Sequence, residues 1–210
     1  MAAVYRWMTG GLAITAIVAY SVATSEAALG LIVGNRLVFL GLFVAEIGLV
    51  ITLSAAVNRL SAAAAGGLFL LYSALNGATL SVVLLVYTGA SVAVAFVTTA
   101  ATFGAMSVYA TVTRRNLASW GSFLFMGLIG VVIASVVNIF LHSSMLSFIV
   151  SCAAVVVFTG LTAYDTQKLR ALARAGGGVA ALPVNGALAL YLDFVNLFLA
   201  VLRLFGSRRD

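Results

Sequence analysis

Long apolar runs separated by short polar breaks make up nearly the whole chain. Crossing ~30 Å of hydrocarbon takes about 20 helical residues at ~1.5 Å per residue. Runs of roughly that length cover residues 5–23, 37–57, 62–86, 90–112, 120–141, 145–164 and 184–205. Lipid offers no hydrogen bonds to an exposed backbone and the runs do not alternate strictly, so each is predicted to be a helix. The pattern predicts an all-α membrane protein: a seven-transmembrane-helix bundle that forms a single polytopic domain over residues 1–210.

Composition excludes the main alternative, a soluble globular protein. Hydrophobic residues make up 64% of the chain, charged residues 8%, and the mean hydropathy is +1.21, whereas soluble domains carry about a quarter charged residues. The first run could instead be a cleaved signal peptide. However, Arg6 is the only basic residue at its start and its apolar part is longer than a signal core. A retained first helix is therefore favoured.

Basic residues are concentrated at the ends of the predicted helices, which explains the net charge of +6 without a nucleic-acid partner. Seven lie on the side of the N-terminus and four on the opposite side, which favours an N-terminus inside the cell. Seven full crossings would then place the basic tail at 207–210 outside, against the same rule. Either the tail is too short to matter, or the last run dips into the membrane and returns.

Residues suited to enzymatic or metal chemistry are scarce. Cys152 is the single cysteine, so neither an intrachain disulfide nor a cysteine-based metal site is expected. His142 has no HxxH or HExxH partner and is interpreted as an interfacial polar residue. The chain also lacks a Gly-rich phosphate loop and a GxSxG elbow. We therefore expect neither an enzyme nor a resident cofactor.

Asp193 is the tenth residue of the last apolar run, with Asn196 three residues later on the same face. A charged side chain at a helix centre costs very roughly 2.5 to 3.5 kcal/mol on insertion scales, so the carboxyl must face protein, water or a partner charge. A purely structural hydrogen bond between helices is the alternative. Interhelical hydrogen bonds are also predicted for two polar stripes, which comprise Ser73, Asn76 and Thr79, and Thr98, Thr99 and Thr102.

Asp165 directly follows the sixth run, one turn before Lys168. It could be an ordinary residue at headgroup level. Alternatively, its carboxyl approaches that of Asp193, because the connection between the two runs is short and brings the chain back beside itself. Counted from that connection, Asp193 is some 9 residues deep and Asp165 about one turn deep. The spacing therefore leaves both interpretations open.

Three segments together resemble the Bax inhibitor family, also called the transmembrane Bax inhibitor motif proteins, in its bacterial form. They are LALYLDFVNLFLAVLRLFG at 188–206, AYDTQKLR at 163–170, and the combination of VYT, FGAMS and RRNLASWG between 86 and 121. The similarity extends over essentially the whole chain. It implies seven helices with the C-terminal helix central, wrapped by the other six, and a pH-sensitive calcium leak.

The resemblance also implies roles for individual residues. An acidic pair at Asp165 and Asp193 would share protons, contact Ca²⁺ transiently and control opening. Arg59 would latch one of these acids in the closed form. Glu46 matches an acidic position inside the second helix and, with Asn196, is a candidate for the cation pathway. The connection at 175–178 is longer and richer in glycine than the family pattern leads us to expect.

The chemistry of the pair supports the same function. Two carboxyls in a partly dry site cannot both ionise cheaply, so they are expected to titrate as one unit near neutral pH. Carboxylate, amide and carbonyl oxygens suit Ca²⁺. The first hypothesis is therefore a leak channel for Ca²⁺ that responds to H⁺.

Two further hypotheses belong to other functional classes. The protein could be an interaction partner in the lipid bilayer that modulates a protease or a cell-death or stress protein. It could also be a proton-coupled carrier, although no inverted repeat is visible. Ten arginines against one lysine indicate a bacterial genome and hence the plasma (inner) membrane.

Overall fold

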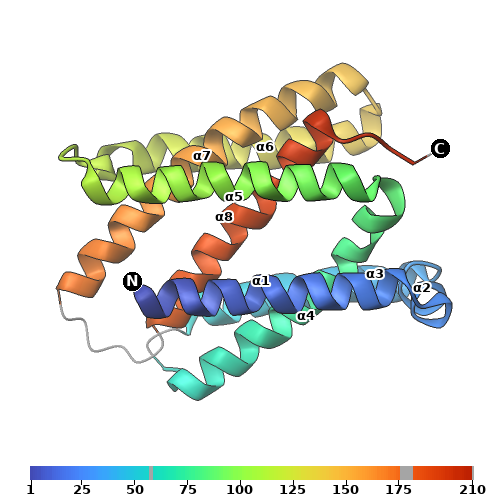
Figure 1. The fold of residues 1–210 in the computed structure, drawn as a ribbon, viewed down its shortest axis with the longest axis horizontal. Helices are drawn as coiled ribbons and strands as arrows, with labels where there is room; N and C mark the ends of the chain where they lie inside the picture. Colours follow the sequence, from blue (N-terminus) through green and yellow to red (C-terminus); the bar gives the residue numbers. More distant parts are fainter. Residues whose placement is uncertain (57–58, 176–181, 210) are drawn as a thin grey trace. The chain divides into compact units, whose positions relative to one another are not determined.

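The computed structural model describes residues 1–56, 59–175 and 182–209, which form eight α-helices and one short 3-10 helix (Figure 1). The elements are α1 (Ala2–Ala23), α2 (Glu26–Ile32), α3 (Arg36–Ala55), α4 (Ala62–Val86), α5 (Gly89–Val112), η1 (Leu117–Trp120), α6 (Gly121–Leu141), α7 (Ser144–Arg174) and α8 (Leu182–Phe205). The described residues contain seven candidate membrane spans. The prediction of an all-α membrane protein with seven such helices is therefore confirmed.

One helix end and one short helix differ from what apolarity alone predicts. Helix α7 continues ten residues past the predicted end of the sixth run, to Arg174. Its last turns are rich in polar residues that form helix readily, so the apolar run marks the hydrocarbon-facing part and not the helix end. The short helix α2 was not predicted, because seven residues are too few to show a helical repeat of apolar positions.

Side-chain caps determine where several helices begin. The Ser25, Ser61 and Ser143 hydroxyls accept hydrogen bonds from backbone N–H groups in the first turns of α2, α4 and α7. The Asn35 side chain accepts two such bonds at the start of α3. Each cap provides a partner for N–H groups that the helix itself leaves unpaired.

The helices form two compact units, each described by itself. Unit 1 contains α1 to α4 and the first part of α8, up to Tyr191, together with the chain end from Arg208. Unit 2 contains α5, η1, α6, α7 and Leu192–Ser207, which holds the remainder of α8.

In unit 1, α1 and α4 pack closely because glycines remove side chains from the contact. A Cβ atom added at Gly77 would lie 2.6 Å from the Thr15 carbonyl oxygen, which is backbone and cannot rotate away. A Cβ atom at Gly11 would meet the Phe69 ring at 2.6 Å. Helix α3 packs on the same α4.

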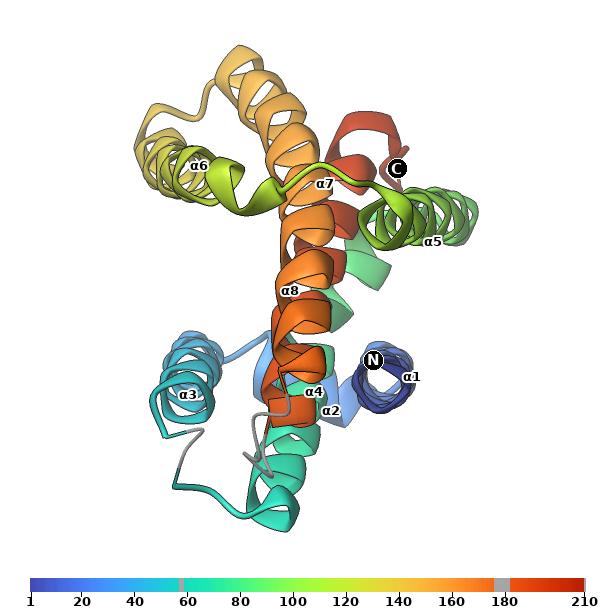
Figure 2. The ribbon, with the colours of Figure 1, turned by 90° about the vertical axis from the view of Figure 1, so that its left-hand side faces the viewer.

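In unit 2, α7 lies between α5 and α6 (Figure 2). The Arg170 side chain donates to the Thr111 carbonyl oxygen, which ties the end of α7 to the end of α5. Gln167 bonds the connection that follows α5, accepting from Leu117 N at 2.7 Å and donating to the Arg115 carbonyl at 3.0 Å. These bonds fix the positions of α5 and α7 relative to each other along their axes.

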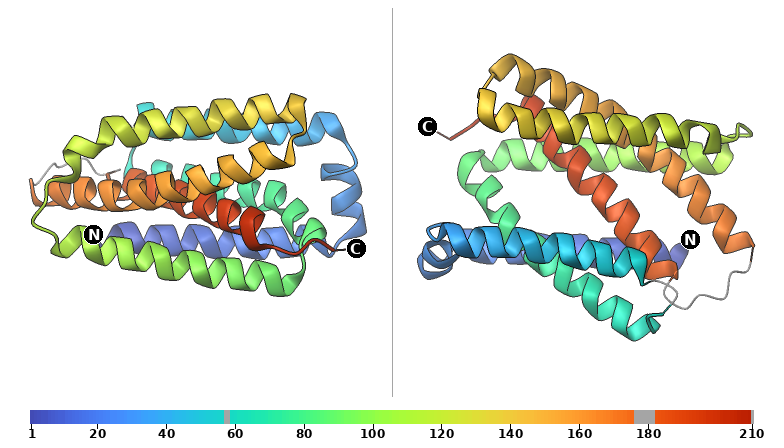
Figure 3. Two further views of the ribbon diagram at one scale, coloured as in Figure 1. Left: turned by 90° about the horizontal axis from the view of Figure 1, so that it is seen from above. Right: turned by 180° about the vertical axis from the view of Figure 1, so that it is seen from behind.

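Helix α8 is uninterrupted (Figure 3), and a larger share of it is buried than of the other spans. In its most apolar window 56% of residues are buried, against 33% or less in the other six. The Tyr191 side chain contacts α1 and α4 in unit 1, and Phe194 stacks edge-on against Phe96 and Phe103 of α5 in unit 2. The central placement of the C-terminal helix is confirmed. A single helix of this length can cross the membrane, unlike a run that dips in and returns.

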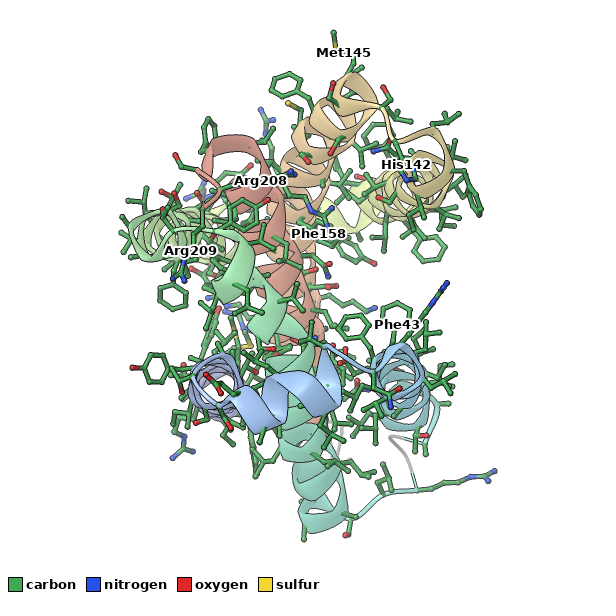
Figure 4. The ribbon with its side chains drawn as sticks, turned by 90° about the vertical axis from the view of Figure 1, so that its right-hand side faces the viewer. Phe43, His142, Met145, Phe158, Arg208 and Arg209 are labelled. Carbon is green, nitrogen blue, oxygen red and sulfur yellow. The ribbon has the colours of Figure 1, made fainter. Side chains whose placement is uncertain are left out.

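Large apolar side chains remain exposed on the outer faces of the spans, as expected for contact with lipid. Figure 4 labels Met145 and His142 at the turn between α6 and α7, where Met145 points away from the helices. His142 has φ 51°, in the left-handed region, and ends α6. Its exposed position fits the expected interfacial polar residue.

The α1–α4 contact can be tested with a pair of glycine substitutions in α4. We expect Gly77→Ala to lower the free energy of unfolding by roughly 1 to 3 kcal/mol, because the added methyl group meets backbone. Gly67→Ala is the matched control, since an added Cβ there meets nothing within 4 Å. Unfolding in detergent measures both variants, and equal effects would contradict the assigned contact.

Candidate functional site

The carboxyl groups of Asp165 and Asp193 meet inside unit 2. Asp165 is on α7 and Asp193 on α8, and the two carboxyls lie close enough to interact electrostatically. Asp193 is only 4% exposed. An ionised carboxylate has no hydrogen to donate, so the two form a hydrogen bond to each other only when one of them carries a proton. We call these two residues the aspartate pair.

The observed helix ends remove the difference in depth that the sequence suggested. Asp193 lies eleven residues after the start of α8, and Asp165 lies nine residues before the end of α7. At ~1.5 Å per residue these depths are ~17 Å and ~14 Å. Asp165 is therefore well inside a helix rather than at its end. The glycine-rich stretch 176–178 of the connection lies outside the described residues.

A single cation neighbours the pair on α7. Lys168 interacts electrostatically with Asp165, three residues before it in the helix. Its ammonium group lies 5.8 Å from the centre of the Tyr164 ring, so the side chain extends along the helix surface. The spacing of three residues in AYDTQKLR was the sequence signal for this contact.

Several buried oxygens in unit 2 have no hydrogen-bond partner among the described residues. One is Asp193 Oδ2 itself. The others are the hydroxyls of Thr99, Ser107, Thr159 and Thr166. Buried polar atoms in proteins are nearly always paired, so each such oxygen is a place where a proton, a water or a cation would be stabilised.

Two of these hydroxyls lie near the level of the two carboxyls. Arg170 of α7 donates to Thr111 of α5, and Thr166 and Ser107 lie four residues before them on the same two helices; Thr166 also directly follows Asp165. Thr99 and Thr159 lie about two turns earlier on α5 and α7, or ~11 Å along the helix axis. In sequence, Thr99 lies between Phe96 and Phe103, whose rings contact Phe194. Phe194 directly follows Asp193 on α8. Sequence reasoning placed Thr99 in a hydrogen-bonded stripe and missed the other three.

Two of the other predicted site residues belong to unit 1. Arg59 lies in the turn between α3 and α4, and its side chain is exposed. Glu46 is buried in α3, where its carboxyl accepts hydrogen bonds from Asn76 and Thr79 of α4. Both are therefore in a different unit from the aspartate pair.

Asn196 lies in unit 2, one turn after Asp193 on α8. Its amide donates to the Leu192 carbonyl at 2.8 Å. The residue lines a pocket of unit 2 together with Ser135, Ser151 and Arg203. Within the described residues no group of three or more His, Cys, Asp or Glu side chains is placed to hold a metal ion.

Seven candidate membrane spans and a buried acidic pair in unit 2 define a multi-pass α-helical membrane protein with an ionisable intramembrane site. The chain belongs to the family described as "Inhibitor of apoptosis-promoting Bax1", whose model matches residues 1–210. The resemblance to the Bax inhibitor family is therefore confirmed across the whole chain.

Bacterial relatives cover the full length of the chain. The "Inner membrane protein YbhL" of Escherichia coli (strain K12) is 51% identical over 214 residues, which include all of this chain and 92% of the relative. An uncharacterized protein of Deinococcus radiodurans is 47% identical, with 100% of this chain and 90% of the relative covered. Another, from Borreliella burgdorferi, is 42% identical with 100% and 92% covered. The protein is a multi-pass membrane protein of the bacterial inner membrane.

The shared proton predicts how stability depends on pH. If Asp165 and Asp193 share one proton in the folded protein, the folded state binds a proton that the unfolded chain has already released above about pH 4. Stability should then fall as pH rises above that value. Asp193→Asn should flatten this dependence, because its amide donates to Asp165 without a shared proton.

Thermal unfolding in detergent across this pH range measures the effect. Glu26→Gln is the control, because Glu26 is an exposed carboxylate in the first turn of α2. A melting temperature that depends on pH equally in the wild type and in Asp193→Asn would show that the pair holds no shared proton.

Proposed function

We propose that this protein is a pH-sensitive leak channel permeable to calcium, in which the aspartate pair senses protons and contacts the cation. The observation that carries the proposal is a bare carboxylate oxygen, Asp193 Oδ2, buried beside a second carboxyl on the neighbouring helix. Such an oxygen is costly to bury unless a proton or a cation compensates it.

Protonation decides which of these partners is present. With one proton shared, the two carboxyls hold α7 and α8 together through their hydrogen bond. When that proton leaves, two like charges face each other, and at ~4 Å they repel by roughly 4 kcal/mol for an effective dielectric constant of about 20. Movement of the helices apart or entry of a cation relieves this repulsion.

The surrounding oxygens favour a hard cation. Ca²⁺ takes six to eight oxygen ligands from carboxylates, carbonyls, amides and water. Carboxyl oxygens and the unpaired hydroxyls of Ser107 and Thr166 offer this type of ligand without a tight cage. Such a site would bind Ca²⁺ weakly enough to release it, as a leak requires.

Arg59 and Asn196 have supporting roles in the proposal. The Arg59 guanidinium latches one acid of the pair in the closed form, since it is a permanent cation on an exposed turn. Asn196 adds an amide to the cation pathway through the pocket that it lines. Glu46 was predicted as another member of that pathway, but it lies in unit 1 and both of its carboxyl oxygens already accept hydrogen bonds, so it has no role in this proposal.

Calcium flux through the purified protein tests the proposal. In dye-loaded vesicles we expect wild-type flux to rise with pH across the titration of the pair. Asp165→Asn and Asp193→Asn should each change the flux several-fold and weaken its pH dependence, because neither variant can form a doubly charged pair.

The flux experiment also distinguishes a channel from a protein that acts only through a partner. Purified protein alone must carry the flux, and the matched control Glu26→Gln, in which an exposed carboxylate is removed, should behave like the wild type. Unchanged flux in both aspartate variants would refute the assigned roles. Flux seen only after a partner protein is added would instead support a modulator.

A further inference from the structure

Glu46 lies in a buried polar site of unit 1 that is separate from the aspartate pair. The side chain is only 7% exposed. Its Oε2 accepts a hydrogen bond from Asn76 Nδ2 at 3.1 Å, and its Oε1 accepts one from the Thr79 hydroxyl at 2.8 Å. Both carboxyl oxygens therefore have donors, in contrast to the bare oxygen of Asp193.

A chain of hydrogen bonds leads to Glu46 from two other helices. The Tyr191 hydroxyl donates to Asn76 Oδ1 at 2.9 Å, and the Thr15 hydroxyl lies 2.6 Å from the Tyr191 oxygen. Tyr191 has one hydroxyl hydrogen, which it uses toward Asn76, so its oxygen is an acceptor for Thr15. The Gly11 and Ser73 carbonyl oxygens, each 2.9 Å from the Thr15 hydroxyl, compete for its one hydrogen. The donors Tyr191 and Asn76 point toward the carboxyl, from α8 through α4 to α3.

The position of Tyr191 is fixed by packing as well as by these bonds. Its ring is fully buried and meets Phe69 and Tyr72 edge-on, with ring centres 5.7 and 5.6 Å away. A side chain held on several sides keeps its hydroxyl aimed at Asn76. The amide is thereby held with its nitrogen toward Glu46, which satisfies Oε2 in either charge state of the carboxyl.

Thr79 allows the other oxygen to take up a proton. When Glu46 is ionised, the Thr79 hydroxyl donates to Oε1. The backbone carbonyl oxygen of Asn76 also lies 3.0 Å from the same hydroxyl. If Oε1 gains a proton, the Thr79 hydrogen can turn to that carbonyl, and the Thr79 oxygen then accepts from the carboxyl. Only hydrogen positions change.

We propose that Glu46 is a second proton-binding site of this protein, in which Thr79 switches from hydrogen-bond donor to acceptor while the chain of Thr15, Tyr191 and Asn76 holds the other carboxyl oxygen in place. The ligand of this site is H⁺ and not a metal ion. Donors already cap both oxygens, and an amide N–H and a hydroxyl hydrogen pointing at the carboxyl would repel a cation.

Few other titratable groups face this carboxyl. Tyr72 of α4 and Tyr191 of α8 interact with it electrostatically, and both are neutral phenols at ordinary pH. Helix α2 also packs on α3, and its acidic residue Glu26 is in the first turn of that helix. Proton uptake at Glu46 is therefore controlled by its burial and its hydrogen bonds rather than by a neighbouring charge.

Infrared difference spectroscopy in lipid vesicles tests the site directly, because a protonated carboxyl has its own C=O band. Between high and low pH, we expect a band that Glu46→Gln removes. Glu26→Gln, the exposed control, should leave it unchanged. The band should persist in Asp165→Asn and Asp193→Asn, so the test of Glu46 is independent of the result for the aspartate pair.

Two substitutions of Thr79 test the switch. Thr79→Val keeps the shape and removes the hydroxyl, so the carboxylate loses a donor and should bind its proton roughly tenfold more tightly, about one unit higher in pH. Thr79→Ser keeps the hydroxyl and should retain the wild-type midpoint. A Glu46 band absent at every pH, equal midpoints in the valine and serine variants, or a band displaced by added Ca²⁺ would each overturn the proposal.

Discussion

A buried oxygen surrounded by hydrocarbon must find a hydrogen or a cation, and this requirement governs the polar residues of the protein. Lipid cannot supply the partner, so a buried oxygen without a hydrogen bond costs several kcal/mol. Unit 1 meets the requirement internally: Glu46, Asn76, Tyr191 and Thr15 satisfy one another. In unit 2, Asp193 keeps one oxygen unpaired among the described residues. The two units therefore suit different ligands.

The same contrast explains why one acid is assigned to a cation and the other to a proton alone. Glu46 receives two donors from a single neighbouring helix, α4, and its negative charge is dispersed over them. Asp193 faces Asp165, another acceptor, so removing their proton leaves two charges with little to disperse them. Each carboxyl is buried, and the hydrogen-bonding capacity of its nearest neighbour decides its chemistry.

The fold could be predicted from the sequence almost completely, because seven apolar runs of membrane-spanning length leave few alternatives. The site could be predicted less well. Asp165 and Asp193 were identifiable as isolated acids, but their depths depended on where α7 and α8 end, and polar helical turns beyond the apolar run concealed this. The unpaired state of Thr99 depends on side-chain rotation and neighbouring helices, which spacing along one helix cannot reveal. Likewise, Thr15 and Tyr191 are far apart in sequence, and no local pattern joins them.

Helix α8 supplies Tyr191 to one site and Asp193 to the other, with only Leu192 between them. Two residues along an α-helix project about 200° apart, so the hydroxyl and the carboxylate leave nearly opposite sides of a stiff rod. Rotation of α8 about its long axis moves both groups through the same angle. A rotation large enough to separate the two acids would therefore also strain the hydrogen bonds of Tyr191, and these bonds oppose rotation of the helix.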